Sequence, residues 1–267
     1  GGDSRFIIDR SNYEVYPGRI TLFSDTLFIT PDFVLQQKDF SGGMLVNMDN
    51  ITLAYHYNHR SNGLENLRTV LDEFSGENER LAALDVKTFP DLFLGIKTSN
   101  ASFGGRLAMA MDSSSDDTNA EEITTSAKAL DMDIGTTLYE VSIGYLDLGL
   151  HFGIQSFSDK NPNNKTEVEN TNGTDLALNV RLNRVIGNNY SLVSLFMLNR
   201  GSLPTAKNTT EVSYTKGEVG IGFRKEDKGI LVAGLVGGFN TEKFKPPETD
   251  NISEETIETK DTALDVT

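Results

Sequence analysis

The chain has no cysteine and no tryptophan, and only three histidines among its 267 residues. Without cysteine, neither a disulfide framework nor a thiolate metal site can form. Basic residues are also scarce, because 24 Lys and Arg stand against 39 Asp and Glu and give a formal net charge of -15. Nucleic-acid phosphates require a basic surface, so this balance argues against a nucleic-acid partner.

Long apolar runs are missing as well. No stretch approaches the roughly 18 to 20 continuous apolar residues that a membrane-spanning helix needs, which excludes a helical membrane protein. The mean hydropathy of -0.32 is typical of soluble proteins. It is equally compatible with membrane-spanning strands, in which only alternate residues face lipid. Gly1, Gly2 and Asp3 fit a chain whose secretory leader has already been removed at a small-residue site.

What the sequence does have is alternation with a period of two. Leu176, Leu178, Val180 and Leu182, for example, alternate with residues that are small, charged or amidic. This pattern is typical of strands with one apolar and one polar face. It recurs in five segments, at 51–58, 102–111, 139–145, 148–155 and 176–183. The third segment predicts that Tyr139 and Tyr145 lie on the apolar face.

The connections show a second regularity. Short polar turns fall near 49–50, 99–100, 147, 187–188 and 227–228, and they alternate with hydrophilic loops at about 58–90, 112–125, 158–173, 200–209 and 241–261. Outer-membrane barrels alternate in this way, because their periplasmic turns are short and their extracellular loops are long. We therefore predict an all-β, antiparallel transmembrane β-barrel.

The strand count follows from these boundaries. They give ten or eleven strands, including an earlier candidate at 20–30, and residues 261–267 resemble the start of another strand. We expect one domain over 1–267 that lacks its last strands, with about 12 to 14 strands if complete. In the loop at about 59–90, apolar residues recur at helical spacing from Asn62 to Ser75 and predict one short amphipathic helix.

Two stretches resemble a known family. Residues 139–157, YEVSIGYLDLGLHFGIQSF, look like a barrel hairpin with a tight Leu-Asp-Leu-Gly turn, and residues 174–198 have the same style. In these stretches the chain resembles Gram-negative outer-membrane β-barrel proteins of the porin-like and hydrophobic-solute transporter-like kind. The resemblance implies an outer-membrane, cell-surface location and passage of hydrophobic or small polar solutes, but it supplies no motif for a substrate site.

The inner face of the predicted strands carries the candidate functional residues. Charged side chains there would set the field that a permeating solute meets. They could equally pair with one another as a solid polar core that closes the lumen. The predicted lumen-facing set is Lys97, Arg106, Glu140, His151, Gln155, Asn179, Arg181, Asn183 and Arg224.

Catalytic chemistry has little support in the sequence. Neither a phosphate-binding loop nor a dinucleotide fingerprint nor a hydrolase elbow is present. A barrel hydrolase would need His56 or His151 as its base, whereas the three histidines are placed too far apart for a metal triad. We therefore predict no enzyme activity and no cofactor or resident metal, apart from irregular divalent-cation binding at the acidic loops 112–122 and 248–261.

The expected partners are outer-membrane lipid or lipopolysaccharide, with further copies of the chain or other surface proteins as additional possibilities. One alternative stays open, since alternation alone would also suit a soluble secreted β-sandwich or a filament or surface-layer subunit. The small and charged inner face and the alternation of short and long connections favour the barrel.

Overall fold

The computed structural model describes residues 12–23, 25–31, 40–57, 62–73, 79–116, 123–141, 144–160, 168–187, 189–206, 210–226, 230–245 and 257–266. Three short helices are α1 (Asn12–Val15), η1 (Pro17–Leu22) and α3 (Glu79–Ala82), and the longer helix is α2 (Asn62–Glu73). The strands of the first half are β1 (Thr26–Pro31), β2 (Phe40–Met48), β3 (Ile51–Tyr57), β4 (Lys87–Lys97), β5 (Ala101–Asp116), β6 (Ile123–Val141) and β7 (Gly144–Lys160). Those of the second half are β8 (Val168–Thr171), β9 (Gly173–Gly187), β10 (Tyr190–Ser202), β11 (Thr205–Ala206), β12 (Glu211–Glu226), β13 (Ile230–Lys245) and β14 (Ile257–Val266).

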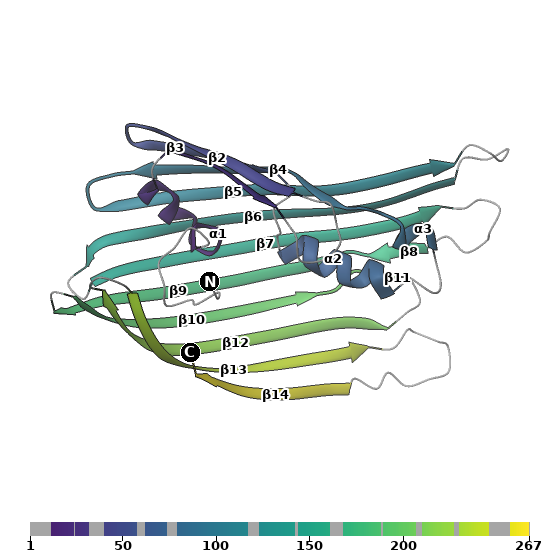
Figure 1. Ribbon diagram of the computed structural model, residues 1–267. Coiled ribbons are helices and arrows are strands. Elements are labelled where there is room, and N and C mark those ends of the chain that lie inside the picture. Colours follow the sequence, from purple (N-terminus) through teal and green to yellow (C-terminus); the bar gives the residue numbers. More distant parts are fainter. Residues whose placement is uncertain are drawn as a thin grey trace.

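The strands form one antiparallel sheet. Its pairing path runs β1-β2-β3-β4-β5-β6-β7-β9-β10-β12-β13-β14, and the short β8 and β11 lie off this path. Each strand on the path therefore pairs with its neighbours along the chain, as in an up-and-down barrel. Figure 1 shows the sheet curving around α1 and α2, which lie on its concave side. Among the described pairings, β1 and β14 are the two ends of the path.

We call the face that carries the helices the inner face and the opposite one the outer face. Along β9, buried and exposed positions alternate from Gly173 to Asn183, and β3 and β7 alternate in the same way. The side chains of a strand point to opposite faces in turn, so the predicted alternation of these segments is confirmed. The predicted all-β antiparallel fold of the barrel type, with a helix in its first long loop, is confirmed too.

The outer face is apolar over many neighbouring strands. Ile134 of β6 is 61 % exposed, Leu176 of β9 is 56 % exposed and Val219 of β12 is 58 % exposed. Further exposed apolar side chains with the same orientation include Leu53, Leu94, Phe103, Met132, Leu150, Phe196, Ile221, Leu235 and Phe239. Soluble monomers rarely expose a contiguous apolar surface of this extent.

Three predicted boundaries are wrong. The candidate strand at 20–30 is interrupted, because η1 occupies its first part and β1 begins only at Thr26. The turn expected at Asp147 is not found there, because β7 runs from Gly144 to Lys160 and includes Asp147. The loop expected at 112–125 is shorter, because β5 continues to Asp116 and β6 starts at Ile123. In the second and third cases, an aspartate inside a strand resembles a turn signal.

Candidate functional site

Residues 15–20 lie directly on the inner face of the sheet. Under this segment, a row of four glycines in register crosses four neighbouring strands: Gly95 of β4, Gly104 of β5, Gly135 of β6 and Gly149 of β7. A Cβ at Gly104 would overlap the carbonyl of Pro17, and one at Gly149 would overlap the carbonyl of Val15. Only glycine lets two backbones approach so closely, so the glycine row forms a seat for this segment.

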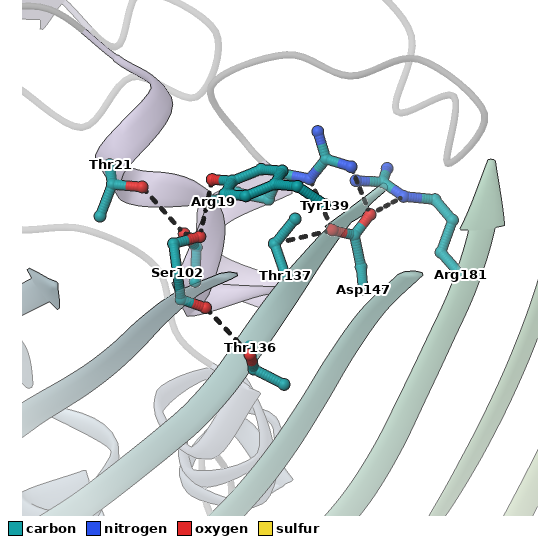
Figure 2. A network of polar contacts seen from close by, with 9 residues as sticks. Arg19, Thr21, Ser102, Thr136, Thr137, Tyr139, Asp147 and Arg181 are labelled. Atoms are coloured by element: carbon teal, nitrogen blue, oxygen red, sulfur yellow. Dashed lines mark hydrogen bonds and ion pairs between the residues drawn. The ribbon is translucent and has the colours of Figure 1, made fainter. Parts of the chain in front are cut away.

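Arg19 fixes the segment to the wall by a buried ion pair. Its Nε donates to Oδ1 of Asp147 at 2.6 Å, and its Nη2 donates to Oδ2 at 2.8 Å. Asp147 also accepts from Arg181 Nε at 2.9 Å and from the Thr137 hydroxyl at 2.8 Å. Figure 2 shows both arginines converging on this carboxylate. A bidentate pair of this kind is strong and directional, so the N-terminal segment has a defined position.

Arg181 is held from two sides. It lies directly opposite Asp147 in the β7–β9 ladder, and its guanidinium carbon lies 4.5 Å from the centre of the Tyr16 ring. The side chain is 0 % exposed. The segment therefore contributes an aromatic face as well as a cation to the same cluster.

A second set of contacts ties the segment to β5. The Ser102 hydroxyl donates to the carbonyl of Gly18 at 2.6 Å, and Tyr139 donates to the Ser102 oxygen at 2.9 Å. Figure 2 shows Tyr139 extending toward the segment. Tyr139 therefore points inward, and its predicted place on the apolar outer face is wrong. Tyr139 continues the inward alternation of Gly135 and Thr137 along β6, so its apolar neighbours in the sequence did not identify its face.

Helix α2 fills a different part of the inner face. Its apolar side chains Leu64, Leu67, Val70 and Leu71 form one buried cluster with Ala110, Ala127, Ala129 and Phe157 of the wall and with Leu81 and Val86. Small alanines on β5 and β6 leave room for the helix. The predicted amphipathic helix in the first long loop is thus present and covers the inner wall.

Between these two inserts lies a layer of buried charge. Arg106 donates to both oxygens of Asp91, at 2.8 Å and 2.9 Å, and its Nη1 lies 3.5 Å from Asp133. His56 contacts the Tyr13 hydroxyl through Nε2 at 2.8 Å. Nδ1 of His56 lies 3.9 Å from Asp91. The layer links β3, β4, β5 and β6 to α1.

His151 is the centre of the remaining part of this layer. Its Nδ1 lies 2.7 Å from Asp133 Oδ1. Its Nε2 faces Asp131 at 3.8 Å and Asp175 at 3.7 Å. The backbone N–H of Gly63, at the start of α2, donates to Asp131 at 3.3 Å. Asp133 thus contacts His151 of the wall, and Asp131 accepts a hydrogen bond from the helix α2.

Several buried amides of the inner face have no hydrogen-bond partner among the residues that the structure describes. Gln155 is 0 % exposed, yet neither its Nε2 nor its Oε1 has a hydrogen-bond partner among the described residues. The same holds for Nδ2 and Oδ1 of Asn183 and for Oδ1 of Asn179. Buried polar groups are normally paired with protein or with ordered water. These amides therefore provide hydrogen-bonding capacity that water or a polar solute can use.

The predicted lumen-facing residues fall into two groups. Arg106, His151, Gln155, Asn179, Arg181 and Asn183 are buried on the inner face. Arg224 is half-buried, and Lys97 is exposed at the last position of β4, where it continues the inward register of Phe93 and Gly95. Glu140 lies in β6, but its side chain is outside the described residues. Their role in solute passage stays a prediction.

Sequence reasoning missed the acidic partners of these residues. Asp131 and Asp133 share the inward register of Ala127 and Ala129 in β6, and Asp91 has the register of Phe93 in β4. The alternation itself could have identified them, since Leu130, Met132 and Ile134 occupy the other face. Arg19 gave no such signal, because it lies in a 3₁₀ helix without strand periodicity.

No cluster suited to a metal ion occurs among the side chains that the structure describes. In the same part of the chain, no helix combines the length and apolarity needed to cross a membrane. The carboxylates of the acidic stretches 116–122 and 248–261 lie outside the described side chains. Divalent-cation binding at these loops therefore stays a prediction.

This chain has distant structural neighbours among solved proteins. Neither a family model nor a curated protein matches the sequence. OmpT, an outer membrane protein of Vibrio cholerae, aligns with 85 % of this chain and 62 % of its own length, at 8 % identity and a TM-score of 0.45. The FrpB iron transporter from Neisseria meningitidis aligns with 85 % of this chain and 41 % of its own, at 10 % identity and a TM-score of 0.48. This chain thus spans less than two thirds of either protein, and the first is by its description an outer-membrane protein, the class that the sequence resembles.

Proposed function

We propose that this chain is a non-catalytic outer-membrane β-barrel protein, a pore or transporter for small polar solutes whose lumen is closed by residues 12–22. The observation that carries the membrane part is the outer face. Apolar side chains such as Ile134 and Val219 are more than half exposed there on neighbouring strands. Such a surface is stable in hydrocarbon and would associate or aggregate in water.

A β-sandwich has less support. The pairing path passes from β1 to β14 without a break, whereas a sandwich needs two separate sheets that cover each other's apolar faces. Here the described apolar outer face is left bare, whereas the buried charges and amides lie on the covered face, beside the apolar cluster that α2 forms there. This distribution is opposite to that of a soluble sandwich and is typical of a membrane barrel.

The unpartnered amides support a conducting role over a purely structural one. A lumen that is permanently filled would be expected to pair all its polar groups. Gln155, Asn179 and Asn183 instead carry unpartnered atoms on the inner face of β7 and β9. These atoms would form hydrogen bonds to water or solute once the N-terminal segment moves away from its seat.

The test is single-channel recording of the full chain in planar bilayers, with and without the Arg19–Asp147 bond. Arg19→Ala removes the bond from the segment, and Arg80→Ala, which removes a half-exposed partner of Asp159, is the matched control. We expect rare openings in the wild type and in Arg80→Ala, and frequent stepwise conductance in Arg19→Ala. A detergent-dependent protein that stays silent in all three forms would refute the pore. A monodisperse protein that is soluble without detergent would refute the membrane location.

A further inference from the structure

The outer face changes character toward the end of the sheet that carries the long connections. The outward residues of β9, β10, β12 and β13 form rows across these four strands. The two apolar rows are Val180, Phe196, Val219 and Gly237, followed by Leu178, Leu198, Gly217 and Phe239. The next two rows are Leu176, Arg200, Thr215 and Thr241, followed by Thr174, Ser202, Ser213 and Lys243. The apolar rows thus give way to two rows of mostly hydroxyl-bearing side chains, each with one basic residue, Arg200 or Lys243. The next outward pair is Glu211 and Lys245.

A cavity of about 340 Å³ lies at this boundary. It is lined by Asn172, Ser202, Leu203, Thr205, Glu211, Val212, Ser213, Lys243 and Lys245. The hydroxyls and the lysine ammonium groups are donors of the kind that phosphate oxygens accept. Glu211 lies directly opposite Lys245 and offsets its charge. The lining residues therefore carry one net positive charge, that of Lys243. In the adjoining β14, Glu258 lies opposite Lys243 and Lys260 lies opposite Thr241, so β14 adds no net charge at these two positions.

Arg200 adds a second cation just below the cavity. It is exposed, and it lies one row closer to the apolar surface than Ser202. No described carboxylate forms an ion pair with Arg200 or Lys243. The two residues are separated by two strand spacings across the sheet and by one row along it, about 12 Å in all. Both long side chains can therefore reach one headgroup.

The level of this patch agrees with a membrane interface. Lys243 pairs with Ser213, which is six residues from Val219 along β12. Six residues extend about 20 Å along a strand, or about 14 Å along the membrane normal for a strand tilted by roughly 45°. This is about half the thickness of a hydrocarbon band roughly 25 to 30 Å tall. If Val219 lies near the midplane, the patch lies at headgroup level.

We propose that Arg200, Lys243 and the adjoining cavity bind the phosphate-bearing headgroup of an outer-leaflet lipid, whose acyl chains lie on Leu198, Phe239 and Val219. The proposal rests on the membrane location proposed above. The charge pattern favours an anionic lipid, because the patch is basic although the chain as a whole carries a net charge of -15. Basic side chains at the membrane surface each contribute about 1 kcal/mol toward anionic lipids.

The experiment measures binding of fluorescently labelled lipopolysaccharide to the full chain in detergent by anisotropy. We compare wild type, Arg200→Ser, Lys243→Ser and the double variant. The matched control is Lys216→Ser, since Lys216 lies on the inward register of β12 with its Nζ 5.2 Å from the centre of the Tyr214 ring. We expect about fivefold weaker binding for each single change and about thirtyfold for the double one, with Lys216→Ser unchanged.

Two further arms identify the ligand source. Enzymatically dephosphorylated lipopolysaccharide should bind the wild type as weakly as intact lipopolysaccharide binds the double variant. Inorganic phosphate at millimolar concentration should not displace the lipid, because it lacks the acyl chains. Equal binding by the double variant and wild type, equal binding of the dephosphorylated lipid, or full displacement by phosphate would each overturn the proposal. If the protein requires detergent but gives one of these three results, the lipid site is refuted and the proposed barrel function is not.

Discussion

Arg19 and Asp147 are 128 positions apart in the sequence and form a buried, two-pronged ion pair. Arg19 belongs to a short N-terminal segment, whereas Asp147 belongs to a wall strand that also pairs with β6 and β9. The contact therefore joins the contents of the lumen to its wall. Both groups are almost fully buried, and removing Asp147 leaves Arg19 and Arg181 without their shared acceptor, whereas removing Arg19 leaves Asp147 paired with Arg181.

Asp147→Asn is predicted to release the N-terminal segment. Breaking a buried ion pair from one side costs about 3 to 5 kcal/mol, and here two arginines lose the same partner. We expect a lower thermal unfolding midpoint and rapid proteolysis within residues 12–22, measured by circular dichroism and mass spectrometry. Asp85→Asn, which removes an exposed partner of Lys87, is the control. Equal proteolysis of the two variants would contradict the proposed attachment.

Gly104→Ala and Gly105→Ala should differ sharply although the two glycines are adjacent. A Cβ at Gly104 would overlap the Pro17 carbonyl, whereas one at Gly105 has the carbonyl oxygen of Asp133 as its nearest neighbour, at 3.7 Å. We expect Gly104→Ala to displace the segment and to increase channel opening. Gly105→Ala should match the wild type in both unfolding midpoint and conductance. Similar behaviour of the pair would argue against the glycine seat.

The outer face should show a depth-dependent response to arginine. Val219→Arg places a charge at the centre of the apolar rows, where it costs about 2 to 4 kcal/mol in a membrane barrel. Thr215→Arg, on the same face of the same strand but near the polar rows, should cost about 0 to 1 kcal/mol. Equilibrium unfolding from lipid vesicles measures both values. Two equal values, or a harmless Val219→Arg, would indicate that this face does not contact lipid.

The Arg106–Asp91 pair allows a test of charge against packing. Asp91→Leu alone leaves Arg106 without its closest acceptor and should destabilise the protein by about 3 to 5 kcal/mol. Adding Arg106→Met should recover most of this loss, because a buried ion pair replaced by apolar side chains is often neutral. Urea unfolding of the two variants and the wild type gives the comparison. No recovery in the double variant would show that Arg106 has further essential partners, such as Asp133.

Much of the strand wall was predictable from the sequence, whereas the position of the N-terminal segment inside it was not. The alternation in β9 correctly assigned Arg181 and Asn179 to one face and Leu178 and Val180 to the other, because a period of two is a local property. Arg19 and Asp147 could not be linked, because no local pattern shows that two segments 128 residues apart meet. The sequence around Asp147 predicts a turn, because an aspartate inside a strand is unfavourable unless a cation pairs with it. That cation, Arg19, is too distant in the sequence to be recognised.

The glycine seat could not be predicted from the sequence either. Gly104, Gly135 and Gly149 are ordinary strand glycines when each is read in its own segment. Their alignment across neighbouring strands depends on the register of two ladders. A register is set by turns and by packing, so the row becomes visible only once the strands are paired.

The shared carboxylate of Asp147 also dictates an order of assembly. Asp147 comes from β7, and Arg181 comes from the strand that pairs with it, so the acceptor site for Arg19 is complete only after these two strands have joined. The glycine seat likewise requires four strands to be side by side. Residues 15–20 therefore dock only after β4, β5, β6, β7 and β9 have paired, and their docking reports that this part of the wall has the correct register.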